Sequence, residues 1–282
     1  MRAVAECYGC LDRLIMTTSK LASDDHDIQA RALTAGRAVL RAEFSTDRIP
    51  TEIATLAQRA IKKASGNTDP FKDVKRREQA LAARVIGEMT GRLGNGPEAL
   101  FSLAALGNTV DFFKNLATAA EEMKRPVKFV LNQIPLLLNR LQEARYVLFL
   151  ADNAGECHFD LPLYQKLCQD GREVVYIVKA QPVQNDLTLD DLVEYGLNEA
   201  FGRVESTGTD SPGLDIEAAS PEFKRLYEKA DLILAKGMGY YETFSETGDR
   251  RVFHLLRAKC APVASALGVP EGSFVAAFSL EG

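Results

Sequence analysis

The chain has 282 residues, of which 46% are hydrophobic and 26% are charged, with a formal net charge of -5 and a pI near 5.4. This mixture is typical of a soluble globular protein with one large domain or two smaller ones, and the acidic balance disfavours a general nucleic-acid binder. No apolar run is long enough to span a bilayer, and the N-terminus lacks the apolar core of a signal peptide, so we expect a cytoplasmic protein that binds no membrane.

Apolar residues recur at helical spacing through roughly the first 140 residues, which predicts an all-helical N-terminal domain over 1–140. Segments rich in Gly, Asn and Pro separate the helices. The expected helices cover residues 27–43, 51–64, about 71–93, a stretch that ends near 106, and about 127–143.

After residue 140 the pattern changes to strands that alternate with helices. Such alternation implies parallel strands, right-handed crossovers and a sheet covered on both faces. We therefore expect a Rossmann-like, three-layer α/β/α domain with a mostly parallel sheet over 141–282. The expected strands cover 145–151, 173–179, 202–205, 231–235 and 273–278. The expected helices between them cover 159–170, 187–199, 219–229 and 253–267.

The five cysteines do not predict a disulfide framework, because their number is odd and no secretion signal precedes them. Cys7 and Cys10 form a C-x-x-C pair in a helical-looking segment. One interpretation is two reduced cysteines one turn apart on a helix. The other is a partial metal or redox cluster completed by Cys260.

An acid and an amide stand at the end of the first expected strand. Asp152 and Asn153 follow the apolar run 147–150, and Asp186 lies just beyond the second expected strand. The carboxyl ends of adjacent parallel strands meet at one edge of a sheet, where ligands bind. Two carboxylates and one amide oxygen suit a hard divalent cation, and they leave positions open for water and substrate. Helix capping is the alternative interpretation of Asp186.

Residues beside these acids suit an anion. A helix that begins near Gly155 would point the N–H groups of Ala154, Gly155 and Glu156 toward the same place, which favours phosphate. Lys236 ends the fourth expected strand, and Gly237 follows it, so an ammonium and exposed N–H groups can also meet a phosphate there. A plain glycine-rich turn with a solvated lysine is the alternative at this second segment.

A third candidate lies between two apolar helical stretches. Asn108 and Asp111 follow Gly107 and can line a cleft that faces the sheet. On its own this segment is a weak signal, because Asn and Asp are ordinary loop residues.

Taken together, these segments resemble the damage-control phosphatase family, long catalogued as a domain of unknown function. The resemblance covers nearly the whole chain and keeps the order of the segments. The C-x-x-C pair and Lys259-Cys260 resemble the mainly prokaryotic and archaeal branch of this family. The segments that carry the resemblance are Cys7-Tyr8-Gly9-Cys10, Asp69-Pro70-Phe71-Lys72-Asp73-Val74-Lys75-Arg76-Arg77, Gly107-Asn108-Thr109-Val110-Asp111-Phe112, Asp152-Asn153-Ala154-Gly155-Glu156 with Phe159-Asp160, Asn185-Asp186-Leu187-Thr188, Ala235-Lys236-Gly237-Met238-Gly239 and Leu255-Leu256-Arg257-Ala258-Lys259-Cys260.

The resemblance implies a metal-dependent phosphatase that acts on small phosphorylated metabolites, such as sugar phosphates or damaged phosphometabolites. It implies a divalent ion (manganese, cobalt, nickel or magnesium) held by Asp152, Asn153 and Asp186. It also implies a phosphate-side role for Lys236, and it matches the Gly-Asn…Asp segment to Asn108 and Asp111.

The expected reaction is phosphomonoester hydrolysis, in which Glu156 or Asp111 orients water or binds substrate hydroxyls. The chain departs from the family pattern at Tyr240, where Asn is frequent, and at Cys157-His158, where two aliphatic residues are usual. Both departures bear on substrate choice more than on the metal site.

Two other functions remain open on the sequence. A Rossmann-like domain with a glycine-rich turn also suits a nucleotide-binding transferase, although the fingerprint of an NAD site is missing after the first strand. The second is a non-catalytic metal- or metabolite-binding protein in which Cys7, Cys10 and Cys260 hold a structural ion.

Overall fold

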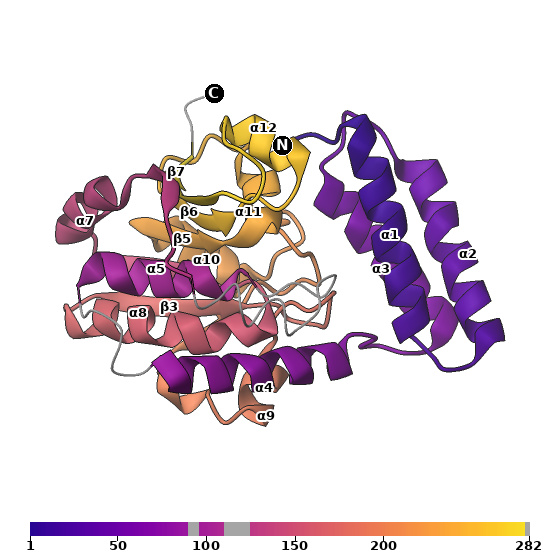
Figure 1. Ribbon diagram of the computed structural model, residues 1–282, viewed down its shortest axis with the longest axis horizontal. Helices are drawn as coiled ribbons and strands as arrows, with labels where there is room; N and C mark the ends of the chain where they lie inside the picture. Colours follow the sequence, from indigo (N-terminus) through magenta and orange to yellow (C-terminus); the bar gives the residue numbers. More distant parts are fainter. Residues whose placement is uncertain (90–95, 110–124, 280–282) are drawn as a thin grey trace.

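The computed structural model describes residues 1–89, 96–109 and 125–279. A single sheet with the strand order β1-β7-β6-β5-β2-β3-β4 forms its centre (Figure 1). All neighbouring strands are parallel except β6 and β7, which are antiparallel. The expected mixed α/β fold with a mostly parallel sheet is therefore confirmed. The strands are β1 (Phe129–Asn132), β2 (Tyr146–Leu150), β3 (Glu173–Val178), β4 (Val204–Ser206), β5 (Leu232–Lys236), β6 (Val252–Arg257) and β7 (Phe274–Phe278).

Helices cover both faces of the sheet. Alternate residues of β2 point to opposite faces, so Val147 and Phe149 join one core cluster while Leu148 and Leu150 join another. The first cluster includes residues of α5, α7 and α8, and the second includes residues of α10 and α11. The helices of this part are α4 (Lys72–Met89), α5 (Pro97–Gly107), α7 (Ile134–Glu143), α8 (Cys157–Gln169), α9 (Leu189–Glu194), α10 (Pro221–Lys229), α11 (Gly237–Phe244) and α12 (Ala261–Leu267), with short 3₁₀ turns η1 (Ala154–Glu156) and η2 (Glu199–Phe201).

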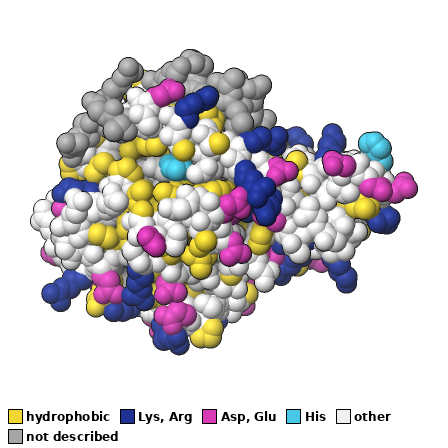
Figure 2. Space-filling view, turned by 90° about the horizontal axis from the view of Figure 1, so that it is seen from below, with side chains coloured by type: hydrophobic (Ala, Val, Ile, Leu, Met, Phe, Trp, Pro, Cys, Tyr) yellow, Lys and Arg dark blue, Asp and Glu magenta, His cyan; other side chains and the backbone are white. Residues whose placement is uncertain are grey.

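Three helices at the N-terminus form a bundle beside the sheet: α1 (Ala5–Leu21), α2 (His26–Glu43) and α3 (Pro50–Ser65). They share a core of Leu, Ile and Ala side chains. Gly36 permits close approach of the helices, since a Cβ atom there would lie 2.7 Å from the Ile15 side chain. The bundle projects to the right of the sheet in Figures 1 and 2, and on the face seen in Figure 2 it carries both acidic and basic side chains.

Two expected helices are partly wrong. Residues 253–257 belong to strand β6, and only 261–267 of the expected helix 253–267 are helical. Strand β1 likewise occupies 129–132 inside the expected helix 127–143. Both errors concern short apolar runs, whose hydrophobic pattern does not distinguish a buried strand from a helix.

The predicted domain division near residue 140 stays a prediction. Within the first 140 residues, α4 contacts η1 and α8, α5 contacts α8, and β1 pairs with β7. Only α1 to α3 stand beside the sheet as a separate group in Figure 1. In the described ranges, no helix is both long and apolar enough to cross a membrane.

Candidate active site

Asp152, Asn153 and Asp186 meet at the carboxyl edge of the sheet. β2 and β3 are parallel neighbours, as expected, so the loops that follow them lie side by side. Asn153 and Asp186 form an isolated backbone bridge, and the N–H of Leu187 donates to the carbonyl of Asp152 at 2.9 Å. The structure therefore brings together the three residues that the sequence predicts as metal ligands.

Two side-chain amides hold the acids in place. Nδ2 of Asn108, just after α5, donates to Asp152 Oδ2 at 2.9 Å and to Glu156 Oε1 at 2.8 Å. Nδ2 of Asn153 donates to the same two carboxylates at 3.1 and 2.6 Å. Because its nitrogen is used in this way, the amide oxygen of Asn153 remains as an oxygen ligand. Asn108, predicted here only weakly, thus touches the reactive acids directly, whereas Asp111 lies outside the described residues.

The acids carry more negative charge than their neighbours balance. Burial, and then the charges of Glu156 and Asp186, raise the pKa of Asp152 well above its usual range. Burial raises the pKa of Asp186 to about 7, although the ammonium of Lys179 lies 3.8 Å from Asp186 Oδ2. This Oδ2 atom is buried and has no hydrogen-bond partner among the described residues. A divalent cation fits the donor set, because it would offset the repulsion and satisfy the orphaned oxygen.

Lys236 lies under the acids and is fully buried. Its Nζ donates to Glu156 Oε2 at 2.7 Å and to Asp160 Oδ1 at 2.6 Å, and Tyr176 Oη donates to Asp160 Oδ2 at 2.8 Å. Burial opposes the charge on Lys236, but Asp160 and Glu156 outweigh it and the pKa of the lysine is raised. Burial would likewise raise the pKa of Glu156, but Lys236 and Lys259 outweigh it and this pKa is lowered.

We call Asp152, Asn153, Glu156, Asp186 and Lys236 the carboxylate floor. Each member is at most 9% exposed, so this charged group lies almost wholly inside the protein. Buried charges of this kind persist only where they pair with one another or bind a ligand.

The backbone conformation and the closeness of Asp152 both require a glycine at position 237. It has φ of 77°, in the left-handed region, and a side chain there would overlap the carboxylate of Asp152. The glycine therefore lets the start of α11 approach the floor. The sequence predicts a phosphate contact for Gly237, and the structure adds a steric reason for its identity.

The N–H groups of the first loop have other partners in this structure. Ala154 N–H donates to the carbonyl of Asn185 at 2.8 Å, and Glu156 N–H donates to that of Asn153 at 2.9 Å. Gly155 packs against the backbone of Glu78 in α4, where a Cβ atom would lie 3.1 Å from the carbonyl oxygen. These contacts fix the loop, so the predicted phosphate cradle does not match the hydrogen bonds that Ala154 and Glu156 make.

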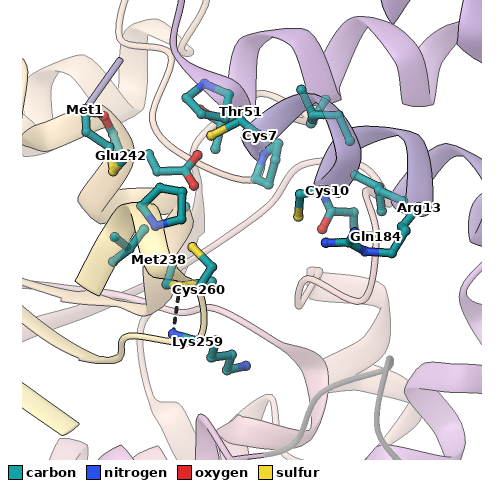
Figure 3. Close-up of a pocket in the computed structure, with 18 of the residues that line it drawn as sticks. Met1, Cys7, Cys10, Arg13, Thr51, Gln184, Met238, Glu242, Lys259 and Cys260 are labelled. Carbon is teal, nitrogen blue, oxygen red and sulfur yellow. Dashed lines mark hydrogen bonds between the residues drawn. The ribbon is translucent and has the colours of Figure 1, made fainter. Parts of the chain in front are cut away.

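A cavity of about 630 Å³ opens above the floor, between the sheet and the bundle. Asn108, Asp152, Asn153 and Asp186 line it, whereas Glu156 and Lys236 lie behind them. Its size is that of pockets for small molecules. One side of the cavity, which we call the helical wall, consists of α1 residues, several of them visible in Figure 3: Glu6, Cys7, Cys10, Leu11, Arg13 and Leu14.

Sequence reasoning missed Lys179, which is fully buried at the end of β3. Its Nζ donates to Tyr240 Oη at 2.8 Å and to the carbonyl of Gly213 at 3.1 Å, and burial lowers the pKa of Lys179 to about 8. The departure from the family pattern at Tyr240 therefore provides a partner for this lysine. Its position at the end of an expected strand is the sequence feature that could have identified Lys179 as a site residue.

Three further residues of the cavity were not predicted as site residues: Arg13, Gln184 and Lys259. On the sequence, Lys259 belongs only to a segment that resembles the family. Its charge acts on Asp152, where burial is the main cause of the raised pKa and Lys259 opposes the rise. Lys259 therefore lies close enough to the floor to meet an anion bound there.

Cys7, Cys10 and Cys260 all line the cavity. Burial raises the pKa of Cys7 and Cys10, and it raises the pKa of Cys260 to about 11, so the three thiols stay protonated at neutral pH. Over 1–89, 96–109 and 125–279, no three His, Cys, Asp or Glu side chains gather in metal-binding geometry. The donor set on the floor is of another kind, since its third member is an amide.

Comparisons with known proteins agree on one family. The sequence matches the family described as "Damage-control phosphatase ARMT1-like domain" over residues 3–275. The damage-control phosphatase PH1575 of Pyrococcus horikoshii is 34% identical over 98% of this chain and 97% of that protein. A damage-control phosphatase of Archaeoglobus fulgidus is 28% identical over 96% of each.

A solved structure agrees as well. The crystal structure of PH1575, described as a DUF89 family protein, superposes with a TM-score of 0.90 at 33% identity and covers 99% of this chain and 100% of that chain. Family match, sequence identity and fold thus coincide over nearly the whole length, and the chain belongs to the ARMT1-like damage-control phosphatase family.

Proposed function

We propose that this chain is a metal-dependent phosphatase that hydrolyses phosphomonoesters of small metabolites. The observation that carries the proposal is the meeting of Asp152, Asn153 and Asp186 at the bottom of a cavity of small-molecule size. The names of the relatives support the phosphatase class, and the buried, unbalanced acids support the need for a cation.

Asp152, Asn153 and Asp186 would supply two carboxylates and one amide oxygen to a divalent ion such as Mn²⁺, Co²⁺, Ni²⁺ or Mg²⁺. When bound, such an ion balances charge on a phosphoryl group and lowers the pKa of a bound water. Asn108 and Glu156 act as positioning residues, because they hold the acids through the amide contacts at 2.8 to 2.9 Å.

Two lysines serve the phosphoryl group in this proposal. Lys259 lines the cavity beside the floor, where an ammonium can meet a phosphoryl oxygen. Lys236 does not line the cavity, so it acts on the phosphoryl group through its charge and through Glu156, to which it donates at 2.7 Å and which holds the amides beside Asp152. Charge on the phosphoryl oxygens grows or spreads in the transition state, and fixed cations stabilise it there.

The test is a phosphatase assay on the purified protein. We expect hydrolysis of p-nitrophenyl phosphate that needs Mn²⁺, Co²⁺, Ni²⁺ or Mg²⁺ and stops with EDTA. Asp152→Ala should lose at least about 1000-fold in kcat while it stays folded, since it removes a ligand of the cation. Asp170→Ala, which alters an exposed acid at the end of α8, is the matched control and should keep wild-type activity.

Two outcomes would contradict the proposal. Hydrolysis that persists at full rate in EDTA would show that the reaction does not need a metal ion. A folded Asp152→Ala variant that is as active as the wild type would show that the reaction centre lies elsewhere.

A further inference from the structure

Arg13 of the helical wall has no carboxylate partner in the described part of the chain. It stands in α1 and lines the same cavity as Asp152 and Asp186 (Figure 3). Its charge acts on the thiol of Cys10, one helical turn earlier, whose pKa burial raises and Arg13 lowers. The guanidinium borders the cavity, and its five N–H donors remain for another group.

Gln184 has a backbone conformation that a glutamine rarely adopts. Its φ is 46°, and it is the one non-glycine residue in the described ranges with positive φ. The N–H of Asp186 donates to the carbonyl of Val183 at 3.1 Å, so Gln184 occupies the second position of a tight turn. Gly, Asn and Asp are the residues that favour positive φ at this position. A glutamine here carries strain of about 1–3 kcal/mol, a feature that gathers at functional sites.

The side chain of Gln184 lies where it can contact a ligand in the cavity. It lines the cavity, and its amide makes no hydrogen bond within the described residues. Gln184 comes two residues before Asp186, so the turn that places a metal ligand also places this amide. Arg13 of α1 and Gln184 of the loop after β3 both line the cavity, and they are drawn next to each other in the view of Figure 3.

The other charges of the cavity leave Arg13 in a position to bind an anion. Glu6, Glu242 and Glu271 also line it, but none of them forms an ion pair with Arg13. Glu6 precedes Arg13 by two helical turns, which places their backbones about 10 Å apart.

We propose that Arg13 and Gln184 form a subsite for a second anionic group on the substrate, a carboxylate or a second phosphate. The inference rests on the proposed phosphatase function and names a class of substrate for it: a phosphomonoester with another anion at its far end. The guanidinium fork matches the paired oxygens of a carboxylate or phosphate, and the Gln184 amide adds an N–H donor from the opposite side.

The experiment compares matched substrates. 6-Phosphogluconate and glucitol 6-phosphate are open chains that differ by a carboxylate in place of a hydroxymethyl group, and fructose 1,6-bisphosphate and fructose 6-phosphate differ by a phosphate. We expect the wild type to favour the member with the second anion in at least one pair, by about 10-fold or more in kcat/KM. The pair that shows the preference identifies whether the subsite takes a carboxylate or a phosphate.

The variants separate a binding role from a structural one. Arg13→Gln should lower this preference about 10-fold to 100-fold, the range for hydrogen bonds to charged groups, and chiefly through KM. Arg13→Lys should recover part of it, because it keeps the charge and loses the fork. Arg31→Gln, which changes an exposed arginine of α2, should leave the preference unchanged.

Gln184→Gly separates the effect of the side-chain amide on substrate preference from the effect of the strained backbone on stability. Glycine accepts the positive φ without strain, so the variant should unfold at the same or a higher temperature than the wild type. The preference should nevertheless fall about 3-fold to 10-fold, since one neutral hydrogen bond is lost.

Different results would overturn the subsite alone and the proposed phosphatase function. Equal kcat/KM within both substrate pairs, or an unchanged preference in Arg13→Gln, overturns the subsite while hydrolysis of p-nitrophenyl phosphate keeps the proposed function. A wild-type protein without phosphatase activity on any of these compounds overturns both.

Discussion

The carboxylate floor and the helical wall face the same cavity but are built differently. Floor residues are buried and held by short contacts, as in the 2.6 to 2.7 Å ion pairs of Lys236 with Asp160 and Glu156. On the wall, Arg13 is exposed and forms no ion pair with a carboxylate of the described residues. A fixed floor suits the reaction itself, which needs preorganised charge, whereas an incompletely paired wall suits a contact that only the substrate completes.

The largest effect should follow from breaking the floor at its centre. Lys236→Met leaves Glu156 and Asp160 buried without their cation, which should destabilise the fold by about 3–5 kcal/mol. Urea unfolding at pH 7.5 measures this loss. We expect the folded fraction to have lost activity as well, because Glu156 no longer holds Asn108 and Asn153 in place.

Lys75→Met is the matched control for this prediction. Lys75 is also buried and pairs with two acids, Asp69 at 2.8 Å and Asp191 at 2.9 Å. It does not line the cavity and touches none of the floor residues through a hydrogen bond, although its charge opposes the rise in the pKa of Asp186 that burial causes. The variant should lose a similar amount of stability and keep far more activity per folded molecule than Lys236→Met. Wild-type kcat/KM in the folded fraction of Lys236→Met would show that this lysine serves the fold alone.

The next effect concerns the approach of α11 to the floor. Gly237→Ala should lower activity about 100-fold, because its methyl group displaces the Asp152 carboxylate, and φ of 77° should cost a further 1–3 kcal/mol of stability. Gly268→Ala has a similar φ of 66° with nothing within 4 Å of the added atom, so it should lose stability and keep activity. Similar kinetics for the two variants would contradict the steric role of Gly237.

The smallest effect lies at the joint between the bundle and the sheet. Burial raises the pKa of Glu242 to about 7, above its ordinary 4.5, although the N-terminal ammonium and Thr51 of α3 oppose the rise. The folded protein thus keeps this proton in a range where the unfolded chain has lost it, and stability falls as the pH rises from about 4.5 to 7.

Glu242→Gln should remove that penalty. We expect the variant to be about 1–3 kcal/mol more stable than the wild type at pH 8 and equal to it near pH 4. Melting temperatures across this range measure the difference. A constant difference at all pH values would mean that Glu242 has the same pKa in the folded protein as in the unfolded chain.

The floor was more predictable from the sequence than the wall. Buried parallel strands are continuous apolar runs, so β2 and β3 could be located, and the acids at their ends followed from the topology. Strand β6 was mistaken for a helix because its six residues show no alternation of apolar and polar positions. The helix α11 was missed because its two glycines indicate a turn.

The wall could not be predicted because its role depends on tertiary packing. Nothing in the spacing of Cys7, Cys10 and Arg13 shows which face of α1 meets the sheet. The strained turn at Gln184 could not be predicted from the sequence, because glutamine is not a residue type that indicates a positive φ. Lys259 belongs to a segment that resembles the family, and its place beside the floor follows from the parallel pairing of β5 and β6, which brings the end of β6 next to the end of β5.

A calorimetric titration of Mn²⁺ into EDTA-treated protein tests the metal site most directly. We expect one ion per wild-type chain, and at least about 100-fold weaker binding in Asp152→Asn and Asp186→Asn, which keep the shape of each ligand and remove its charge. Wild-type affinity and stoichiometry in both variants would contradict the claim that the strand-end acids hold the catalytic cation.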